Sequence, residues 1–357
     1  MNNQRTKFLS RLGFEHPIIQ APMAGVSSPA MAAAVSNAGA LGSIGFGAVD
    51  AKGAGEMIDA TRKLTDRSFQ VNVFCHQPAL TDAARESAWL ERLRPEFVKV
   101  GAEPPSTLRE IYRSFLLDDA TLELLLTTRP AVLSFHFGLP TAAKLKRLRD
   151  AGIFLLASAT NLEDARTIAA AGVDAVIAQG YEAGGHRGMF DLAKRDDKLS
   201  TFALTRLLVR NLDIPVVAAG GIMDGAGIAA ALQLGAVAAQ LGTAFVGCPE
   251  SLADSGYRAA LKSEAAEHTV MTAVISGRPA RCLANRFTHW GSDVQPAQIP
   301  DYPIAYDAGK ALHAAAKARS EFGYGAQWAG QGAPLARSWP AADLVRELTR
   351  ELREAAQ

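Results

Sequence analysis

The sequence predicts an α/β fold, a parallel (β/α)₈ TIM barrel with an added, mainly helical cap domain. The chain has 357 residues and is 48% hydrophobic, which suffices for a large buried core. Short apolar runs, rich in β-branched or small residues and ended by Gly, Pro or polar residues, alternate with amphipathic segments. Eight runs are expected to be strands: Pro17–Gln20, Leu41–Gly45, Gln70–Phe74, Ala131–Phe135, Phe154–Ser158, Val173–Ala178, Pro215–Ala219 and Ala236–Leu241.

Helical patterns lie between these strands, and glycine ends several of them. The expected helices are Pro29–Ala38, Gly55–Leu64, Ala142–Ala151, Leu162–Ala171, Phe202–Arg210 and Ala226–Leu234. An open, doubly wound sheet would show the same alternation and stays an alternative. Since the loop after the first strand lacks the GxGxxG pattern of such folds, the repeated βα units favour the barrel.

Two stretches fall outside the barrel. The first separates the third and fourth strands and has helical patterns at Asp82–Leu93 and Leu108–Leu126. The second follows Cys248 and has a Gly/Pro-rich centre before a charged helix, Ala341–Ala355. The expected domains are a barrel over 1–248 with an insertion at 77–129, completed by a C-terminal helix within 335–357, and a helical substrate cap over 249–334.

Composition excludes several classes of function. Lys plus Arg number 37 and Asp plus Glu number 36, so no nucleic acid or membrane partner is indicated. Cys75, Cys248 and Cys282 lack the spacing of a disulfide framework or a zinc site, and no metal is expected. The N-terminus has no apolar signal core, and no run approaches the ~20 residues needed to span a bilayer. These features predict a cytoplasmic protein, and its oligomeric state, monomer or dimer, stays open.

In a barrel, the loops after the strands form the active site. Polar residues and glycines gather there in this chain: APMAG at Ala21–Gly25, Asn72, His136, QGYEAGGHRG at Gln179–Gly188, AAGGI at Ala218–Ile222 and QLGTAF at Gln240–Phe245. Gly220, Gly221, Gly242 and Thr243 follow the seventh and eighth strands, where barrels commonly bind phosphate through main-chain N–H groups. Such glycines are also ordinary turn residues.

The remaining strand-end residues suit a flat heteroaromatic ring. The side-chain amides of Asn72 and Gln179 both donate and accept, as the pyrimidine edge of a flavin requires, and the loop Pro22–Gly25 provides a rigid proline and a compliant methionine to pack against a ring. Either amide alone could instead satisfy local backbone groups. A phosphate site at one end and amides at the other fit FMN.

Two motifs carry candidate catalytic and substrate-binding groups. His186 lies beside paired glycines that allow close approach of a ligand, and its side chain suits proton transfer near neutrality, although a solvated loop is the alternative. Tyr302, Tyr306 and Lys310 share a helix face if the chain is helical after Pro303, which would present two phenols and an ammonium to an anion. Packing tyrosines and a surface lysine would give the same pattern.

The motifs resemble the nitronate monooxygenase family, formerly called 2-nitropropane dioxygenases, and specifically its class I branch. The resemblance runs from the first strand into the cap, through QAPMAGVSSPAMAAAVSNAGALGSIG, LSFHFGLP, QGYEAGGHRG, AAGGI and YPIAYDAGK. One departure is Ala40, where many relatives have a second glycine. The resemblance implies FMN-dependent oxidation of alkyl nitronates, favouring propionate 3-nitronate, with O₂ to a carbonyl compound and nitrite, as a detoxification.

By position, the resemblance makes His186 the catalytic residue. It places His136, Tyr302, Tyr306 and Lys310 around the substrate, although His136 could equally be a hydrogen-bonded core residue. The motifs and the resemblance together give these expected cofactor-binding residues: Pro22, Met23, Ala24, Gly25, Asn72, Gln179, Gly184, Gly185, Gly220, Gly221, Gln240, Leu241, Gly242 and Thr243.

Two other enzyme classes compete with this interpretation. An FMN-dependent NAD(P)H:quinone or enoyl-thioester reductase would share the flavin site, but it needs an open groove for the nicotinamide rather than the tyrosines and lysine of YPIAYDAGK. A phosphate-binding lyase or isomerase would be expected to carry a Schiff-base lysine at a strand end, and none is evident there. A flavin-binding protein without catalysis would not need His186. The physiological nitro compound, the use of neutral nitroalkanes and the number of electrons moved at a time stay open.

Overall fold

The computed structural model describes residues 3–357, and its centre is a barrel of eight parallel strands in the order β1-β9-β8-β6-β5-β4-β3-β2. The strands are β1 (Ile18–Gln20), β2 (Gly42–Gly45), β3 (Phe69–Phe74), β4 (Val132–His136), β5 (Phe154–Ala159), β6 (Ala175–Gln179), β8 (Val216–Ala219) and β9 (Ala238–Leu241). Each overlaps one of the eight predicted strands, and the predicted fold class is confirmed.

The sheet closes on itself between β1 and β2. The main-chain N–H of Gln20 donates to the carbonyl of Leu41 at 2.9 Å, and the N–H of Leu41 donates to the carbonyl of Ile18 at 3.0 Å. These bonds join the two edge strands, so no barrel edge stays unpaired at this seam. All strands are parallel, so their carboxyl ends, where the predicted site residues lie, open at one mouth.

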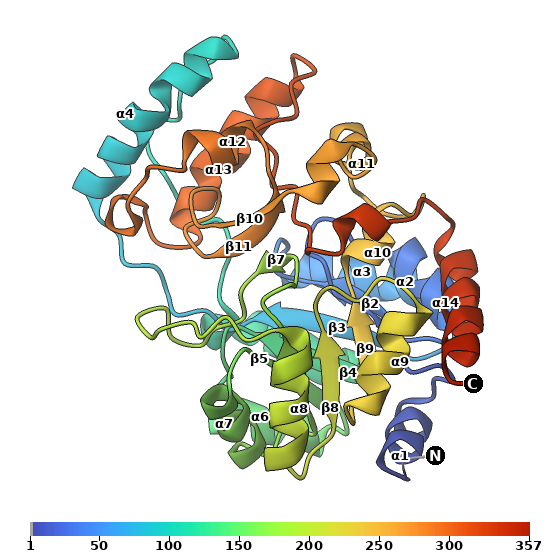
Figure 1. The fold of residues 1–357 in the computed structure, drawn as a ribbon. Coiled ribbons are helices and arrows are strands. Elements are labelled where there is room, and N and C mark those ends of the chain that lie inside the picture. Colours follow the sequence, from blue (N-terminus) through green and yellow to red (C-terminus); the bar gives the residue numbers. More distant parts are fainter. Residues whose placement is uncertain (1–2) are drawn as a thin grey trace.

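Helices surround the barrel (Figure 1). They are α2 (Pro29–Asn37), α3 (Ala51–Arg62), α5 (Asp119–Thr128), α6 (Ala142–Asp150), α7 (Leu162–Ala170), α8 (Thr201–Asn211) and α9 (Gly225–Gln233). Each begins after a side chain that accepts a hydrogen bond from the first turn, which satisfies an otherwise free backbone donor: Ser28, Asp50, Asp118, Thr141, Asn161, Ser200 and Asp224. The C-terminal helix α14 (Ala341–Ala355) packs against α9 and α2 and completes the ring, while α1 (Asn3–Leu12) packs Phe8 and Leu12 onto the barrel.

The stretch between β3 and β4 divides into two parts. Helix α4 (Ala83–Lys99) leaves the barrel and packs against α13 (Ile304–Lys317) of the cap, whereas α5 contacts α3 and α6 in the ring. The predicted helix over Leu108–Leu126 is wrong in its first part, where residues 108–114 are irregular and only a 3₁₀ turn, Phe115–Leu117, precedes α5. Here Leu108 packs into the cap and Tyr112 against Tyr302, so tertiary contacts bury these apolar positions without a helix.

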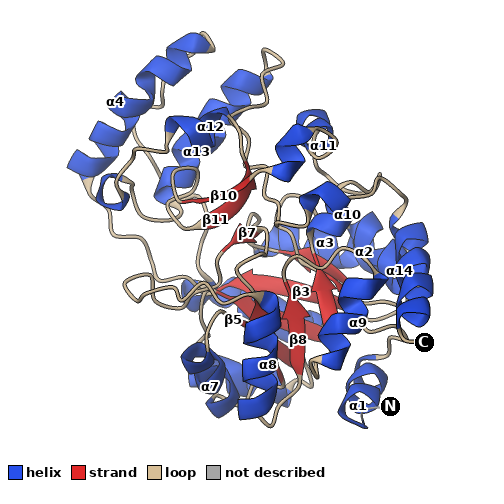
Figure 2. Cartoon of the chain, in the orientation of Figure 1, coloured by secondary structure: helices blue, strands red, loops and turns tan. Residues whose placement is uncertain are grey.

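The cap contains a small antiparallel sheet besides its helices (Figure 2). Strands β10 (Thr269–Thr272) and β11 (Ala280–Leu283) pair with each other, and β11 pairs with β7 (Gly185–His186), which belongs to the loop after β6. The other cap elements are α11 (Ser255–Ala260), α12 (Arg286–Trp290) and α13. Because β7 pairs with β11, the cap holds the loop that carries His186 over the barrel mouth. No helix within residues 3–357 is both long and apolar enough to cross a membrane.

Candidate active site

A cavity at the carboxyl ends of the strands collects most of the predicted site residues. Its walls include Pro22, Met23, Ala24, Asn72, His136, Gln179, Gly184, Gly185, His186, Gly220, Gly221, Gln240, Gly242, Thr243, Tyr302 and Tyr306. Barrel loops supply the floor, and the cap supplies Tyr302, two residues before α13 begins, and Tyr306 in its first turn. Both parts of the chain therefore build one site.

Three predicted residues lie elsewhere. Leu241 is 1% exposed and packs into the hydrophobic core, because neighbouring side chains of a strand point to opposite faces and Gln240 takes the cavity side. Gly25 and Lys310 line a second, adjoining cavity. The rings of Tyr112 and Tyr306 border both cavities, and the Lys310 ammonium lies 4.9 Å from the centroid of the first and 5.5 Å from that of the second.

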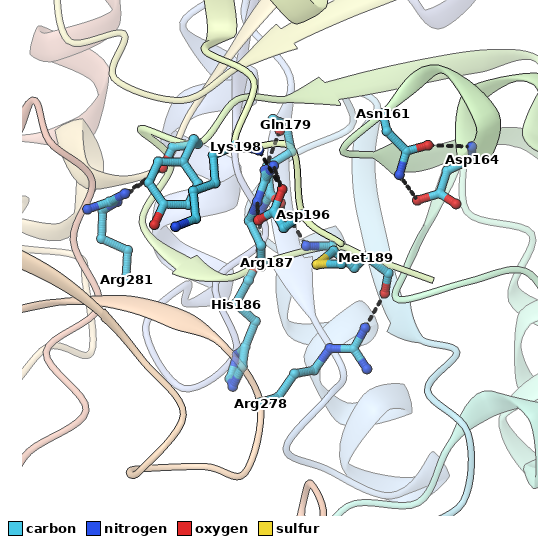
Figure 3. A network of polar contacts seen from close by, with 12 residues as sticks. Asn161, Asp164, Gln179, His186, Arg187, Met189, Asp196, Lys198, Arg278 and Arg281 are labelled. Carbon is cyan, nitrogen blue, oxygen red and sulfur yellow. Dashed lines mark hydrogen bonds and ion pairs between the residues drawn. The ribbon is translucent and has the colours of Figure 1, made fainter. Parts of the chain in front are cut away.

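Hydrogen bonds fix the loop that carries His186. The side-chain amide of Gln179 donates to the carbonyl of His186 at 2.9 Å and accepts from the N–H of Gly188 at 2.7 Å. The Nε2 atom of His136 lies 3.1 Å from the same His186 carbonyl. Buried Arg187 donates to the carbonyl of Gln179 at 2.7 Å and forms a two-pronged ion pair with Asp196 at 2.9 Å (Figure 3). Gln179 and His136 thus hold the loop as well as line the cavity.

The imidazole of His186 is held in its neutral form. Burial, followed by the charges that His136, Arg278 and His76 would carry, lowers its pKa well below the ordinary value. Burial also lowers the pKa of His136 and that of His76 to about 4, with Arg278 contributing to both. A neutral imidazole can accept a proton near pH 7, which a histidinium cannot.

Phenols form the wall opposite the barrel loops. The ring of Tyr302 lies edge-on to His186, with centroids 5.2 Å apart, and its buried hydroxyl has no hydrogen-bond partner among the described residues. Burial raises the pKa of Tyr302 far above its usual range and that of Tyr306 to about 12, so both phenols keep their protons. The site therefore offers neutral hydrogen-bond donors to an acceptor ligand.

The structure adds residues that no motif indicated. His76 lies at 5.0 Å from Tyr302 between ring centroids, and Trp328 lies at 5.1 Å from His186. Ser276 contacts His186, and Arg278 is 4% exposed with its guanidinium 4.1 Å from the Phe137 ring centroid. Within residues 3–357 no carboxylate pairs with Arg278, whose Nη2 donates to the carbonyl of Met189 (Figure 3). These residues come from three separate parts of the chain, with Ser276 and Arg278 in one turn, so their positions in the sequence gave no signal.

Known proteins resemble this chain over nearly its whole length. The sequence model of the nitronate monooxygenase family matches residues 6–351. Proteins named nitronate monooxygenase from Paraburkholderia phytofirmans and Pseudomonas aeruginosa are 62% and 54% identical, each over 97% of this chain and over 95% and 99% of the relative.

Solved structures of known proteins also resemble this chain over nearly its whole length. The nitroalkane oxidase of Streptomyces ansochromogenes superposes with a TM-score of 0.90 at 41% identity, covering 99% of both chains. FabK from Thermotoga maritima superposes less closely, with a TM-score of 0.76 at 29% identity over 100% of this chain and 98% of that one. The family model matches nearly the whole chain, and the named relatives and the solved nitroalkane oxidase also cover nearly all of it. The chain therefore belongs to the nitronate monooxygenase family of flavin-dependent oxidoreductases and oxidises nitronates.

Proposed function

We propose that the flavin is FMN and that the protein oxidises small alkyl nitronates, propionate 3-nitronate among them, with O₂ to a carbonyl compound and nitrite. The observation that carries this proposal is the composition of the cavity. Its barrel side is glycine-rich main chain and amides, and its cap side is His186 with the phenols Tyr302 and Tyr306. One side suits a flat phosphorylated cofactor, and the other suits a small oxyanion.

The residues at the barrel mouth fit FMN. Gly220 and Gly221 have φ values of 123° and 69°, which side chains rarely adopt, so bare main chain faces the cavity after β8. After β9, the Oε1 atom of Gln240 is buried without a partner among residues 3–357, and no side chain of those residues caps the short helix that follows Gly242. Unused main-chain donors suit a phosphate, and the unused amide oxygen of Gln240 suits the ring edge.

The cap residues suit a nitronate. Tyr302 presents a buried, protonated hydroxyl that can donate to a nitro oxygen, and neutral His186 can take the α-proton from a nitroalkane that arrives unionised. Bound FMN would accept electrons from the nitronate and deliver them to O₂. The rings of Tyr302, Tyr306 and Trp328 line the cavity beside His186, where the reductase alternative would need room for a nicotinamide.

Purification should yield a yellow protein that releases FMN and not FAD on denaturation. The physical reason is that the barrel mouth offers one phosphate-binding region, while the loop after the first strand lacks a dinucleotide motif. Chromatography and mass spectrometry of the released flavin provide the measurement. A colourless protein that FMN cannot reconstitute would contradict the cofactor assignment.

Anaerobic addition of ethylnitronate should bleach the flavin rapidly, whereas NADH should reduce it slowly or not at all. The cap side of the cavity presents His186 and the phenols Tyr302 and Tyr306, which suit a small anion, and stopped-flow absorbance measures both rates. Rapid reduction by NADH with an inert nitronate would instead support the reductase alternative, to which the FabK superposition is relevant.

A further inference from the structure

A turn of the cap reaches into the active site beside His186. Residues 273–279 connect β10 to β11, and β11 pairs with β7 so that Ala280 lies opposite His186. The N–H of Arg187 also donates to the carbonyl of Pro279 at 2.8 Å. A Cβ atom on Gly277 would lie 2.6 Å from the Pro300 carbonyl oxygen, so the turn is packed tightly against the chain that leads into α13. The turn is therefore fixed relative to the imidazole.

Ser276, at the centre of this turn, is fully buried and contacts the imidazole directly. Its Oγ lies 2.9 Å from Nε2 of His186 and 3.2 Å from the carbonyl oxygen of Arg278. A serine hydroxyl has one proton to donate. If that proton goes to the Arg278 carbonyl, the Ser276 oxygen can only accept, and Nε2 must carry a proton to form the second bond.

The opposite arrangement satisfies fewer groups. If Ser276 donated to Nε2, the Arg278 carbonyl would lose its side-chain hydrogen bond, and the remaining ring proton would lie on Nδ1 of His186. The ring hydrogen bond that His186 makes to the described residues is through Nε2 and not through Nδ1, so no partner in the described residues favours a proton on Nδ1. Leaving a buried polar group without a partner costs about 1–3 kcal/mol, whereas the first arrangement makes both bonds.

We propose that Ser276 is a positioning residue that holds His186 in the tautomer with the proton on Nε2, so that Nδ1 is the atom that accepts a proton from substrate. This inference deepens the proposed function and rests on it for the substrate. In the step, the α C–H bond of a neutral nitroalkane breaks and its electron pair stays on the substrate as the nitronate. The proton forms the Nδ1–H bond, and the imidazole becomes an imidazolium whose Nε2–H still donates to Ser276.

The surroundings of His186 support a neutral ring with one defined tautomer. His136 on β4, His76 after β3, Arg278 on the turn and the phenols Tyr302 and Tyr306 of the cap face it, and no carboxylate of the described residues contacts it. Without an anionic partner, the ring is not held as an imidazolium before substrate binds. The neutral contact with Ser276 therefore decides which nitrogen is free.

The direct test is ¹⁵N NMR of the FMN-loaded protein labelled in its histidines, with the His186 signals assigned from their loss in His186→Asn. At neutral pH we expect a protonated Nε2 and an unprotonated Nδ1 in the native protein, and a mixture of tautomers in Ser276→Ala. A proton on Nδ1 in the native protein would overturn the proposal. This measurement needs no substrate, so its outcome is independent of whether the proposed function is right.

Kinetics give the functional consequence. We expect Ser276→Ala to lower kcat/KM for freshly dissolved nitroethane about tenfold, which is the effect of losing one hydrogen bond. The kcat/KM for ethylnitronate should stay within about threefold of the wild-type value, because only nitroethane needs a base. Ser276→Thr, which keeps the hydroxyl, should restore most of the loss. Equal losses on both substrates would show a merely structural role.

Ser36→Ala is the matched control. Ser36 is 1% exposed, and its hydroxyl also makes two hydrogen bonds, donating to the Ser68 carbonyl at 2.9 Å and accepting from the Gly42 N–H at 3.1 Å, on the barrel side of the molecule. Its loss should lower thermal stability without changing the ratio of the two kcat/KM values. If wild-type protein oxidises neither substrate while the NMR shows the expected tautomer, the proposed function fails and the role of Ser276 in positioning the ring stands.

Discussion

Replacing His186 by asparagine should lower turnover of a neutral nitroalkane by about a hundred- to ten-thousand-fold, the usual range for loss of a general base. His186 is neutral and lines the cavity, whereas asparagine cannot accept a proton at this position. A preformed nitronate has already lost its α-proton, so its oxidation should suffer much less. Oxygen uptake with nitroethane and with ethylnitronate measures the difference, with flavin content checked in each preparation.

His289→Asn provides the control for this substitution, because His289 is exposed on α12 in the cap. It should change neither rate. If His186→Asn slowed both substrates equally, His186 would act on the bound anion rather than on the proton. If it slowed neither, His186 would be no more than a residue of a glycine-rich loop.

Replacing Lys310 by methionine should weaken the binding of propionate 3-nitronate about ten- to a hundredfold. This is the effect of losing a charge-assisted contact of about 1.5–3 kcal/mol. Lys310 is exposed and lies beyond the rings of Tyr112 and Tyr306, so we expect it to meet the distal carboxylate and not the nitro group. Ethylnitronate, which has no carboxylate, should therefore be nearly unaffected. Steady-state oxygen consumption gives KM and kcat for both nitronates.

Lys317→Met is the matched control, since Lys317 is also on α13 but its ammonium is bound to Asp254 at 3.0 Å. Lys317→Met should leave unchanged the ratio of the KM values for the two nitronates. An equal effect of Lys310→Met on both nitronates would mean that Lys310 does not recognise the carboxylate.

The barrel could be predicted because each of its parts has a local signal. Apolar strands are ended by glycine, proline or polar residues, and helices start at capping side chains, so the eight strands of the structure overlap the predicted ones. The alternation within a strand also explains where two predicted cofactor-binding residues lie. Gln240 and Leu241 were expected to act together, yet adjacent strand residues face opposite sides, which places Leu241 in the core.

The structure of the cap was harder to predict from the sequence, because its contacts join segments that are distant in the chain. The sequence predicted one helix face for Tyr302, Tyr306 and Lys310, but Tyr302 precedes α13. Tyr306 and Lys310 both lie in the helix, where 3.6 residues per turn rotate the second side chain by about 40° from the first, and Lys310 lines the second cavity. Strands β10 and β11 have no strong alternating pattern, and their sheet depends on pairing with β7. Ser276 therefore meets His186 across 90 residues of sequence, a contact that no local pattern encodes.

The buried guanidinium of Arg278 links the stability of this chain to the charge of its ligands. Burial lowers the pKa of Arg278 to about 10, and no carboxylate of the described residues offsets its charge. Arg278 acts electrostatically on His186 and Tyr302, which line the active-site cavity, so an anion bound there would supply a counter-charge that a neutral molecule of the same shape would not. Binding and resistance to unfolding are thermodynamically linked, so ionised ligands would stabilise the fold more than their direct contacts alone suggest.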